Sequence, residues 1–289
     1  MNKKYLIAVS GGPDSMYLLN KYKDKDVVVA TVNYNQRHDS GVDFNIVKDF
    51  CKLYNIKFEG LNLNKPDYTG GNFQNWAREK RYKFFKEIYK KYNCNELLIG
   101  HNIDDFLETA IYQSITKRIN KYYGIKRTNN LYEMNINRPL INKYFKKTIV
   151  KKCINLGIPF HVDYTNDTDK YFRNKIRLEN NKLLKFTKLM YFIKFKLINL
   201  FNKVKWSFVN RNYKKWERSE FSQDSFEFLK FKDQLIFDFI NNNYFGIKLS
   251  KNKISNISKF IVSKNRTQRF KLEDNVFLDK KKGKLIRQK

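Results

Sequence analysis

The 289-residue sequence has few cysteines, few acidic residues and no long apolar run, and each shortage excludes a class of protein. Cys51, Cys94 and Cys153 are its only cysteines; they stand far apart and form no CxxC pair, which argues against a disulfide framework and against a zinc site. We therefore expect free thiols and a reducing cytoplasm. No run of about 18 uncharged apolar residues exists, so we expect no membrane span. An apolar segment follows Met1 almost at once, so we expect no signal peptide.

The acidic residues are strongly outnumbered, because 28 Asp and Glu stand against 59 Lys and Arg, which gives a net charge of +31. Such a field attracts polyanions over about one Debye length. The chain also holds 25 Phe and 19 Tyr, whose rings can stack on exposed bases. Nucleic acid is therefore the expected partner. The alternative is that part of the lysine covers a solvated surface and reflects an AT-rich genome.

The first 160 residues alternate between strand-like and helix-like segments. Strands are expected at residues 5–10, 27–34, 56–63 and 96–101, and helices at residues 14–22, 40–55, 72–92 and 104–115. This alternation predicts an α/β fold with a parallel, Rossmann-like sheet and helices on both faces. Ligands bind beyond the carboxyl ends of the strands in such sheets. We therefore expect residues 10–15, 33–37 and 101–108 to lie on one rim.

The pattern changes from about residue 180. Residues 182–206 form a basic amphipathic stretch, which alone is compatible with a helix on a membrane surface; we favour a linker helix. Residues 276–287 (VFLDKKKGKLIR) predict a hairpin that turns at residues 281–283. The expected organisation is a catalytic domain at residues 1–180, a basic linker helix at 181–206 and a smaller, mainly helical C-terminal domain at 207–289 with a terminal hairpin.

Residues 10–15 (SGGPDS) join the first expected strand to a helix. Two glycines allow anionic oxygens to approach the backbone, and proline suits the first helical turn, whose N–H groups face a phosphate. No lysine follows as in a GxxxxGK[ST] loop, and the chain has no GxGxxG. The aspartate cannot bind phosphate directly, so it either holds Mg²⁺ or caps the helix. The nucleotide-binding candidates are Ser10, Gly11, Gly12, Pro13, Asp14 and Ser15.

This loop resembles the SGGxDS signature of the PP-loop ATP pyrophosphatases, which cleave ATP between the α- and β-phosphates. Other segments resemble the tRNA(Ile)-lysidine synthetase family, in order across residues 5–177. Residues 100–110 (GHNIDDFLETA) resemble its HHxxDQxET segment, with Asn102 and Phe106 in place of the second His and the Gln. The remaining matches are residues 32–40 with the family's second-strand segment, including Arg37 and Ser40, residues 76–85 with AR-x-x-RY, residues 138–141 with RPLL, and residues 158–177 with GIPxxxDxSNxDxxYxRNxIR.

The resemblance implies a reaction in which ATP, L-lysine and the wobble cytidine of an isoleucine tRNA with anticodon CAU give lysidine, AMP and pyrophosphate. It also implies that residues 207–289 bind tRNA, as a shortened form of the family's tRNA-binding region. The family's glycine-rich stretch after ETxxxR is absent here, where residues 114–125 read SITKRINKYYGI.

The candidate site residues follow from the rim and from the resemblance. Asp14 and Asp105 are candidates for Mg²⁺, and the catalytic candidates are Asp14, His101, Asp105 and Glu108. The base that takes a proton from lysine is left open among the last three. Arg78 is assigned to the nucleotide, with a solvated helix face as the alternative. Contacts to tRNA or lysine are expected from Arg81, Arg173, Asn174 and Arg177, of which the last three could instead form a turn and a helix cap.

Three other functions compete. A tRNA thiolase of the same superfamily is the nearest enzyme alternative; those thiolases that use catalytic thiols need a pair of cysteines near the active site, which three isolated cysteines do not provide. A small-molecule PP-loop ligase has no need of a charge of +31. A non-catalytic RNA-binding protein is disfavoured because the SGGPDS loop is intact.

Overall fold

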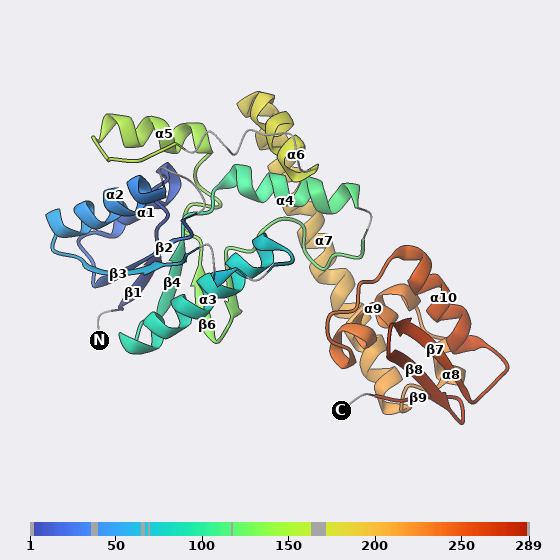
Figure 1. Cartoon of the computed structure of the whole chain (residues 1–289). Coiled ribbons are helices and arrows are strands. Elements are labelled where there is room, and N and C mark those ends of the chain that lie inside the picture. Colours follow the sequence, from blue (N-terminus) through green and yellow to red (C-terminus); the bar gives the residue numbers. More distant parts are fainter. Residues whose placement is uncertain are drawn as a thin grey trace. The chain divides into compact units, whose positions relative to one another are not determined.

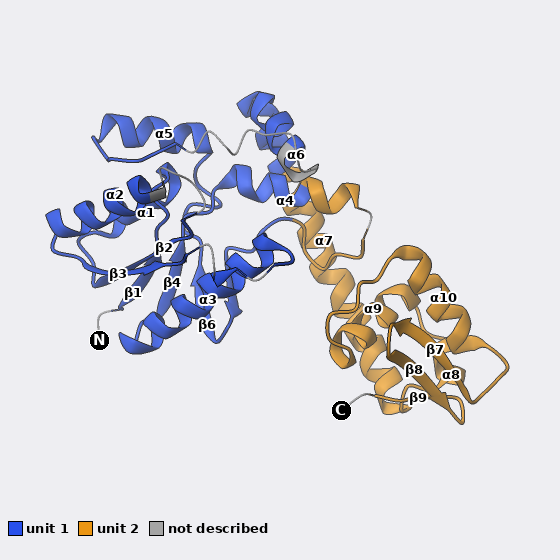
Figure 2. Ribbon diagram, in the orientation of Figure 1, with its two compact units in different colours: residues 1–110, 124–192 blue, residues 111–123, 193–289 orange. Residues whose placement is uncertain are grey.

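The computed structural model describes residues 3–35, 40–64, 67–68, 70–116, 118–162 and 172–287, apart from the side chains of Ser40 and of residues 172–174. The chain divides into two compact units (Figure 2). Unit 1 comprises residues 1–110 and 124–192, and unit 2 comprises residues 111–123 and 193–289.

Unit 1 is built on a six-stranded sheet with the strand order β3-β2-β1-β4-β6-β5. All neighbouring strands pair in parallel except β5, which is antiparallel to β6. The strand order reverses between β1 and β4, which is where open α/β sheets bind their ligands. The strands are β1 (Tyr5–Ala8), β2 (Val27–Asn33), β3 (Lys57–Asn62), β4 (Glu96–Ile99), β5 (Thr128–Leu131) and β6 (Met134–Asn137).

Helices cover both faces of this sheet, as Figure 1 shows. Helices α1 (Pro13–Tyr22), α2 (Ser40–Leu53) and α5 (Lys146–Asn155) pack on one face, and α3 (Phe73–Lys91) packs on the other. Adjacent strand residues alternate between the two cores: Ile7 packs in the first and Leu6 in the second, and both are fully buried. The α/β fold with a parallel sheet and helices on both faces is therefore confirmed. Two further helices are α4 (Ile103–Ile115), which directly follows β4, and α6 (Phe172–Lys182).

Unit 2 is mainly helical and ends in a small antiparallel sheet. Its elements are α7 (Lys185–Arg218), which begins in unit 1, α8 (Gln223–Glu227), α9 (Lys232–Asn243), α10 (Lys251–Val262), β7 (Gln268–Glu273), β8 (Val276–Lys281) and β9 (Lys284–Leu285). Aromatic rings centre the core, with the Trp216 ring 4.7 Å from Phe226 and 5.2 Å from Phe221. The hairpin expected near the end is confirmed as β8–β9, and Lys282 and Gly283 at its turn both have positive φ.

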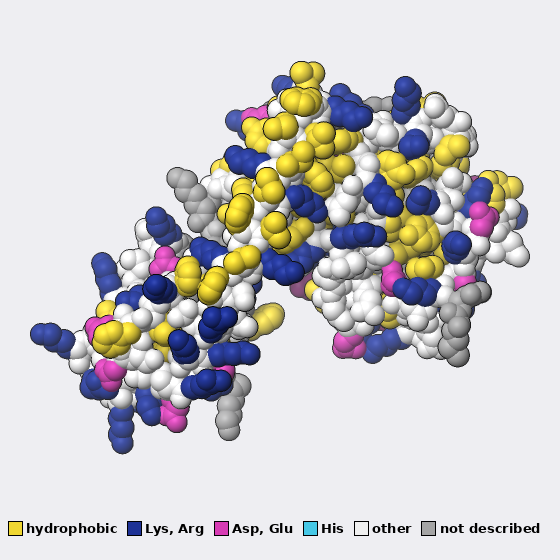
Figure 3. Space-filling model, turned by 180° about the vertical axis from the view of Figure 1, so that it is seen from behind, with side chains coloured by type: hydrophobic (Ala, Val, Ile, Leu, Met, Phe, Trp, Pro, Cys, Tyr) yellow, Lys and Arg dark blue, Asp and Glu magenta, His cyan; other side chains and the backbone are white. Residues whose placement is uncertain are grey.

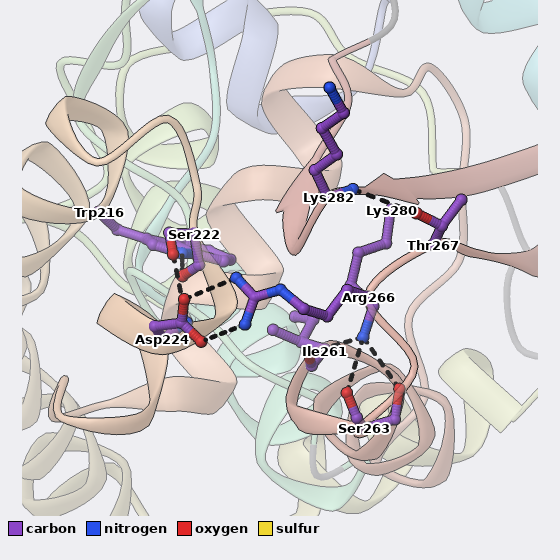
Figure 4. A network of polar contacts seen from close by, with 9 residues as sticks. All are labelled: Trp216, Ser222, Asp224, Ile261, Ser263, Arg266, Thr267, Lys280 and Lys282. Atoms are coloured by element: carbon purple, nitrogen blue, oxygen red, sulfur yellow. Dashed lines mark hydrogen bonds and ion pairs between the residues drawn. The ribbon is translucent and has the colours of Figure 1, made fainter.

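A buried lysine ties the sheet of unit 2 to the end of α10 (Figure 4). Lys280 is 1% exposed, and its Nζ donates to the carbonyl of Ile261 at 3.1 Å and to the hydroxyl of Ser263 at 2.9 Å. A cation suits this position because the last carbonyls of a helix lack partners within the helix. Beside it, Arg266 donates to both carboxylate oxygens of Asp224, at 3.0 and 2.8 Å.

The surface is basic on the face shown in Figure 3, where Lys and Arg side chains are spread over both units and Asp and Glu are few. Long α7 carries apolar side chains that remain exposed, such as Phe186 and Phe201, between its lysines. Among the described residues, none of the helices combines the length and the apolar character needed to cross a membrane.

Candidate functional site

A cavity of about 300 Å³ opens beyond the carboxyl ends of β1, β2 and β4 in unit 1. It lies at the point where the strand order reverses, as expected for this architecture. The ends of three strands that are far apart in sequence supply its wall, including Ser10, Tyr34 and His101. The full lining is Ala8, Val9, Ser10, Gly12, Asp14, Ser15, Val32, Tyr34, Arg78, Arg81, Tyr82, Phe85, Ile99, Gly100, His101 and Asp105.

The two glycines of the SGGPDS loop have different tasks. Gly11 has φ +81°, and a Cβ there would lie 2.8 Å from the carbonyl oxygen of Asp43, so both the conformation and the space require glycine. Gly12 is the N-cap of α1 and provides no side chain for capping, while Pro13 occupies the first turn. The first N–H groups of α1 are thus left for an anionic ligand.

The two serines brace the loop. The Ser10 backbone N–H donates to Oγ of Ser15 at 3.1 Å, and the Ser15 hydroxyl donates to the carbonyl of Gly12 at 3.0 Å. These bonds hold the turn in the shape of an anion cradle before any ligand binds.

His161, which the sequence did not indicate as a site residue, contacts both the SGGPDS loop and α2. Its backbone N–H donates to the carbonyl of Gly11 at 3.1 Å, and its Nδ1 lies 3.0 Å from Oδ1 of Asp43 on α2. The segment after α5 is therefore fastened to the nucleotide loop and to α2.

Asn102 joins the two candidate metal carboxylates and was also missed. Its Nδ2 donates to Oδ1 of Asp14 at 2.9 Å, and its backbone N–H donates to Oδ2 of Asp105 at 2.8 Å. Its own Oδ1 accepts from the backbone N–H of Asp104 at 2.7 Å, which caps the start of α4. Asn102 is fully buried, so this bridge is part of the core. The available signal was an N-cap residue type directly before a helix.

The carboxyl groups of Asp14 and Asp105 both have pKa values above the ordinary value for aspartate. Burial raises the pKa of Asp14 to about 6, although the hydrogen bond from Asn102 opposes this. Burial, followed by the nearby charge of Asp14, raises the pKa of Asp105 to about 7. Glu108 raises it further, whereas Arg177 lowers the pKa of both aspartates.

Such a pair fits a divalent cation. Carboxylate oxygens are the ligands that Mg²⁺ prefers, and a cation would relieve the repulsion that raises both pKa values. The described residues contain no cluster of three or more His, Cys, Asp or Glu that could hold a metal by itself. Mg²⁺ is commonly held by one or two protein carboxylates together with phosphate oxygens.

Two arginines on α3 line the same cavity as the carboxylates. Arg78 and Arg81 both line the cavity, and the Arg78 guanidinium lies 4.7 Å from the centre of the Tyr82 ring. The Tyr34 hydroxyl donates to the carbonyl of Ala77 at 3.0 Å and anchors this part of α3 to the end of β2. Planar guanidinium groups at this place suit phosphate oxygens.

Not every candidate reaches the cavity. Its wall contains Ser10, Gly12, Asp14, Ser15, Arg78, Arg81, His101 and Asp105. Four candidates do not line it, namely Gly11, Pro13, Glu108 and Arg177. Arg37 and the side chains of Arg173 and Asn174 lie outside the described residues.

The cysteines are unsuited to catalysis. Cys51, Cys94 and Cys153 are buried free thiols. Burial raises the pKa of Cys51 to about 12 and those of the other two to about 11, so none is a thiolate near neutral pH.

Comparison with known proteins shows the family to which the chain belongs. The PP-loop domain family matches residues 1–184. A tRNA(Ile)-lysidine synthase of Mycoplasmopsis pulmonis is 46% identical over 282 residues, covering 96% of each chain, and one of Mesomycoplasma hyopneumoniae is 40% identical, covering 98% of this chain and 95% of that one. A U34-tRNA thiolase structure from Methanococcus maripaludis, at 18% identity and a TM-score of 0.53 over 68% of this chain and 72% of its own, shares the fold. The chain, with its PP-loop and its full-length likeness to these synthases, belongs to the tRNA(Ile)-lysidine synthase family.

Proposed function

We propose that this chain uses ATP to join L-lysine to the wobble cytidine of an isoleucine tRNA with anticodon CAU, and releases AMP and pyrophosphate. The lysidine product changes the codon that the anticodon reads from AUG to AUA. One observation carries the site assignment: the SGGPDS loop, the carboxylates of Asp14 and Asp105, and the arginines Arg78 and Arg81 share one cavity.

The loop and the arginines are proposed to hold the triphosphate. The N–H groups at the start of α1 and the two braced serines suit the pyrophosphate that leaves. Asp14 and Asp105 are the residues that would hold Mg²⁺, which supplies positive charge to the phosphate oxygens when it is bound. No lysine stands in this loop to supply that charge, which explains the aspartate there.

The chemistry needs two steps at the C2 carbon of cytosine. The carbonyl oxygen is a poor leaving group, and adenylation converts it into a good one. The ε-amine of lysine then forms the new C–N bond as the bond from C2 to the AMP oxygen breaks. Only about one lysine in a thousand is neutral at pH 7, because the amine has a pKa of about 10.4. A base must therefore take a proton first, and the candidates are His101, Asp105 and Glu108, of which His101 and Asp105 line the cavity.

The tRNA is proposed to bind by its phosphates to the basic surface, including residues 207–289, and to present its wobble base unstacked. The free, buried cysteines suit a reducing cytoplasm. They also disfavour the thiolase alternative, because the three thiols are isolated and protonated.

The Asp14→Asn variant tests the assignment of the loop. We expect lysine incorporation into tRNA to fall by about 100-fold or more, because a neutral amide is a weaker ligand for Mg²⁺ than a carboxylate. Binding of tRNA in a filter assay should stay within about twofold, since Asp14 lines the cavity and is not one of the basic residues proposed to bind the tRNA phosphates. Unchanged lysine incorporation in this variant would remove Asp14 from the mechanism.

A further inference from the structure

Arg138, directly after β6, is buried and held by two acceptors. Its Nη1 donates to the carbonyl of Lys126 at 3.0 Å and to Oδ1 of Asn129 at 2.6 Å. Only 5% of the residue is exposed. The guanidinium plane is therefore fixed by the β5–β6 hairpin and the chain leading into it, and not by solvent.

The Nε–H of this fixed group points at His101. The distance from Nε of Arg138 to Nδ1 of His101 is 3.0 Å. An arginine side chain only donates hydrogen bonds and stays charged, so Nδ1 must be the acceptor. A neutral imidazole with a lone pair on Nδ1 carries its single proton on Nε2.

The imidazolium form does not fit this arrangement. A proton on Nδ1 would set one N–H against another at 3.0 Å and would place two cations side by side in a partly buried setting. A lone pair on Nε2 would require the same proton on Nδ1. Either route by which His101 could act as a base is thus opposed by Arg138.

We propose that Arg138 is a positioning residue that holds His101 as the neutral Nε2–H tautomer, so that His101 acts as a hydrogen-bond donor and not as the base for lysine. The assignment of the tautomer does not depend on the proposed function. The identity of the oxygen to which the Nε2–H donates does rest on the proposed function. His101 shares the cavity with Arg78 and the SGGPDS loop, so its partner there is an anionic oxygen of the nucleotide. Of the three candidate bases this leaves the carboxylates Asp105 and Glu108, of which Asp105 lines the cavity.

The tautomer can be measured directly by long-range ¹H–¹⁵N correlation NMR on the full chain. The sequence has three histidines, and single substitutions of His38 and His161 assign the signals. At pH 7.5 we expect His101 to show one protonated nitrogen, Nε2, and one unprotonated nitrogen, Nδ1. A protonated Nδ1 in the unsubstituted protein would overturn the proposal, without bearing on lysidine formation.

Arg138→Met removes the donor and leaves an unbranched apolar side chain in place of the aliphatic part of the arginine. We expect the His101 signals of this variant to move to a mixture of tautomers, with imidazolium growing in as the pH falls. Unchanged signals would show that Arg138 does not set the tautomer. If this variant does not fold, the spectrum of the unsubstituted protein still decides the question.

A pair of His101 variants separates a donor from a base. The amide N–H of glutamine lies where Nε2–H lies in histidine, but the amide cannot accept a proton near neutral pH. We expect His101→Gln to keep kcat within about tenfold of the original and His101→Ala to lose about 100-fold to 1,000-fold, the usual effect of removing one preorganised donor. Equal losses in both variants would assign His101 as the base. A complete lack of lysine transfer in the unsubstituted chain would instead refute the proposed function and leave the NMR result standing.

Discussion

Replacing Asp105 by Asn should stabilise unit 1 of the metal-free protein at pH 8. Asp105 has a folded pKa of about 7 against 3.8 for an unperturbed aspartate, because burial and the charge of Asp14 oppose ionisation. The folded state binds the proton more tightly than the unfolded state, so stability falls as the pH rises above 3.8 and the full cost is reached above pH 7. Three units of pKa correspond to about 4 kcal/mol. Part of this free energy belongs to the coupled pair of Asp105 and Asp14 and not to Asp105 alone. We therefore expect Asp105→Asn to raise the free energy of unfolding by about 2–4 kcal/mol.

Asparagine is a suitable replacement because its Oδ1 can still accept from the Asn102 backbone N–H, which now donates to Oδ2 of Asp105 at 2.8 Å. At pH 5 the original carboxyl is mostly protonated, so the gain from Asp105→Asn should fall to less than half of its value at pH 8. The variant should nevertheless lose lysine transfer, which makes it an exchange of function for stability.

Hydrogen exchange followed by mass spectrometry in EDTA measures the stability of β4 and of residues 103–110 of α4 separately from that of unit 2. Asp24→Asn, at an exposed carboxyl of the same unit, is the matched control and should change protection at neither pH. If protection in Asp105→Asn at pH 8 is equal to or lower than that in the unsubstituted protein, the reasoning is refuted. Such a result would mean that ionised Asp105 does not destabilise the folded state.

Three further expectations follow from the contacts. Asn102→Asp keeps the cap of α4 but adds a charge between Asp14 and Asp105, so α4 should lose about 2 kcal/mol of protection at pH 8 and recover at pH 5; a loss equal at both pH values would exclude the electrostatic cause. Lys280→Met leaves carbonyls at the end of α10 without a buried donor, so unit 2 should melt about 8–20 °C lower by calorimetry, whereas exposed Lys282→Met should change little. Affinity for tRNA should fall with salt with a log–log slope of about 0.7–0.9 for each phosphate neutralised, and a slope near zero would contradict phosphate binding.

The fold was largely predictable because the sheet of unit 1 is buried on both faces. Its central strands are mostly apolar, as in YLIA at Tyr5–Ala8 and VVVATVN at Val27–Asn33, and the helices between them show clear periodicity. The β5–β6 hairpin was not predicted. Its turn is formed by Tyr132 and Glu133, both at positive φ, instead of the Asn-Gly or Asp-Gly that usually signals such a turn.

The site residues that belong to sequence motifs could be predicted. The contacts between residues far apart in the sequence could not. The loop with Asp14 and the segment with His101 and Asp105 were predicted to share a rim, and they line one cavity. The bridge from Asn102 to Asp14 spans 88 residues of sequence, so local patterns could show the helix cap but not the contact. The donation from Arg138 to His101 likewise depends on the packing of β6 beside β4.

The central claim is tested most directly by incubating the purified chain with ATP, radiolabelled lysine and tRNA transcripts. We predict label in the isoleucine tRNA with anticodon CAU, located at the wobble position by nuclease digestion, with one AMP released for each lysine joined. Methionine tRNA, the other amino acids and reactions without ATP should give none. Lysine-independent AMP release with no labelled wobble nucleotide would contradict the account.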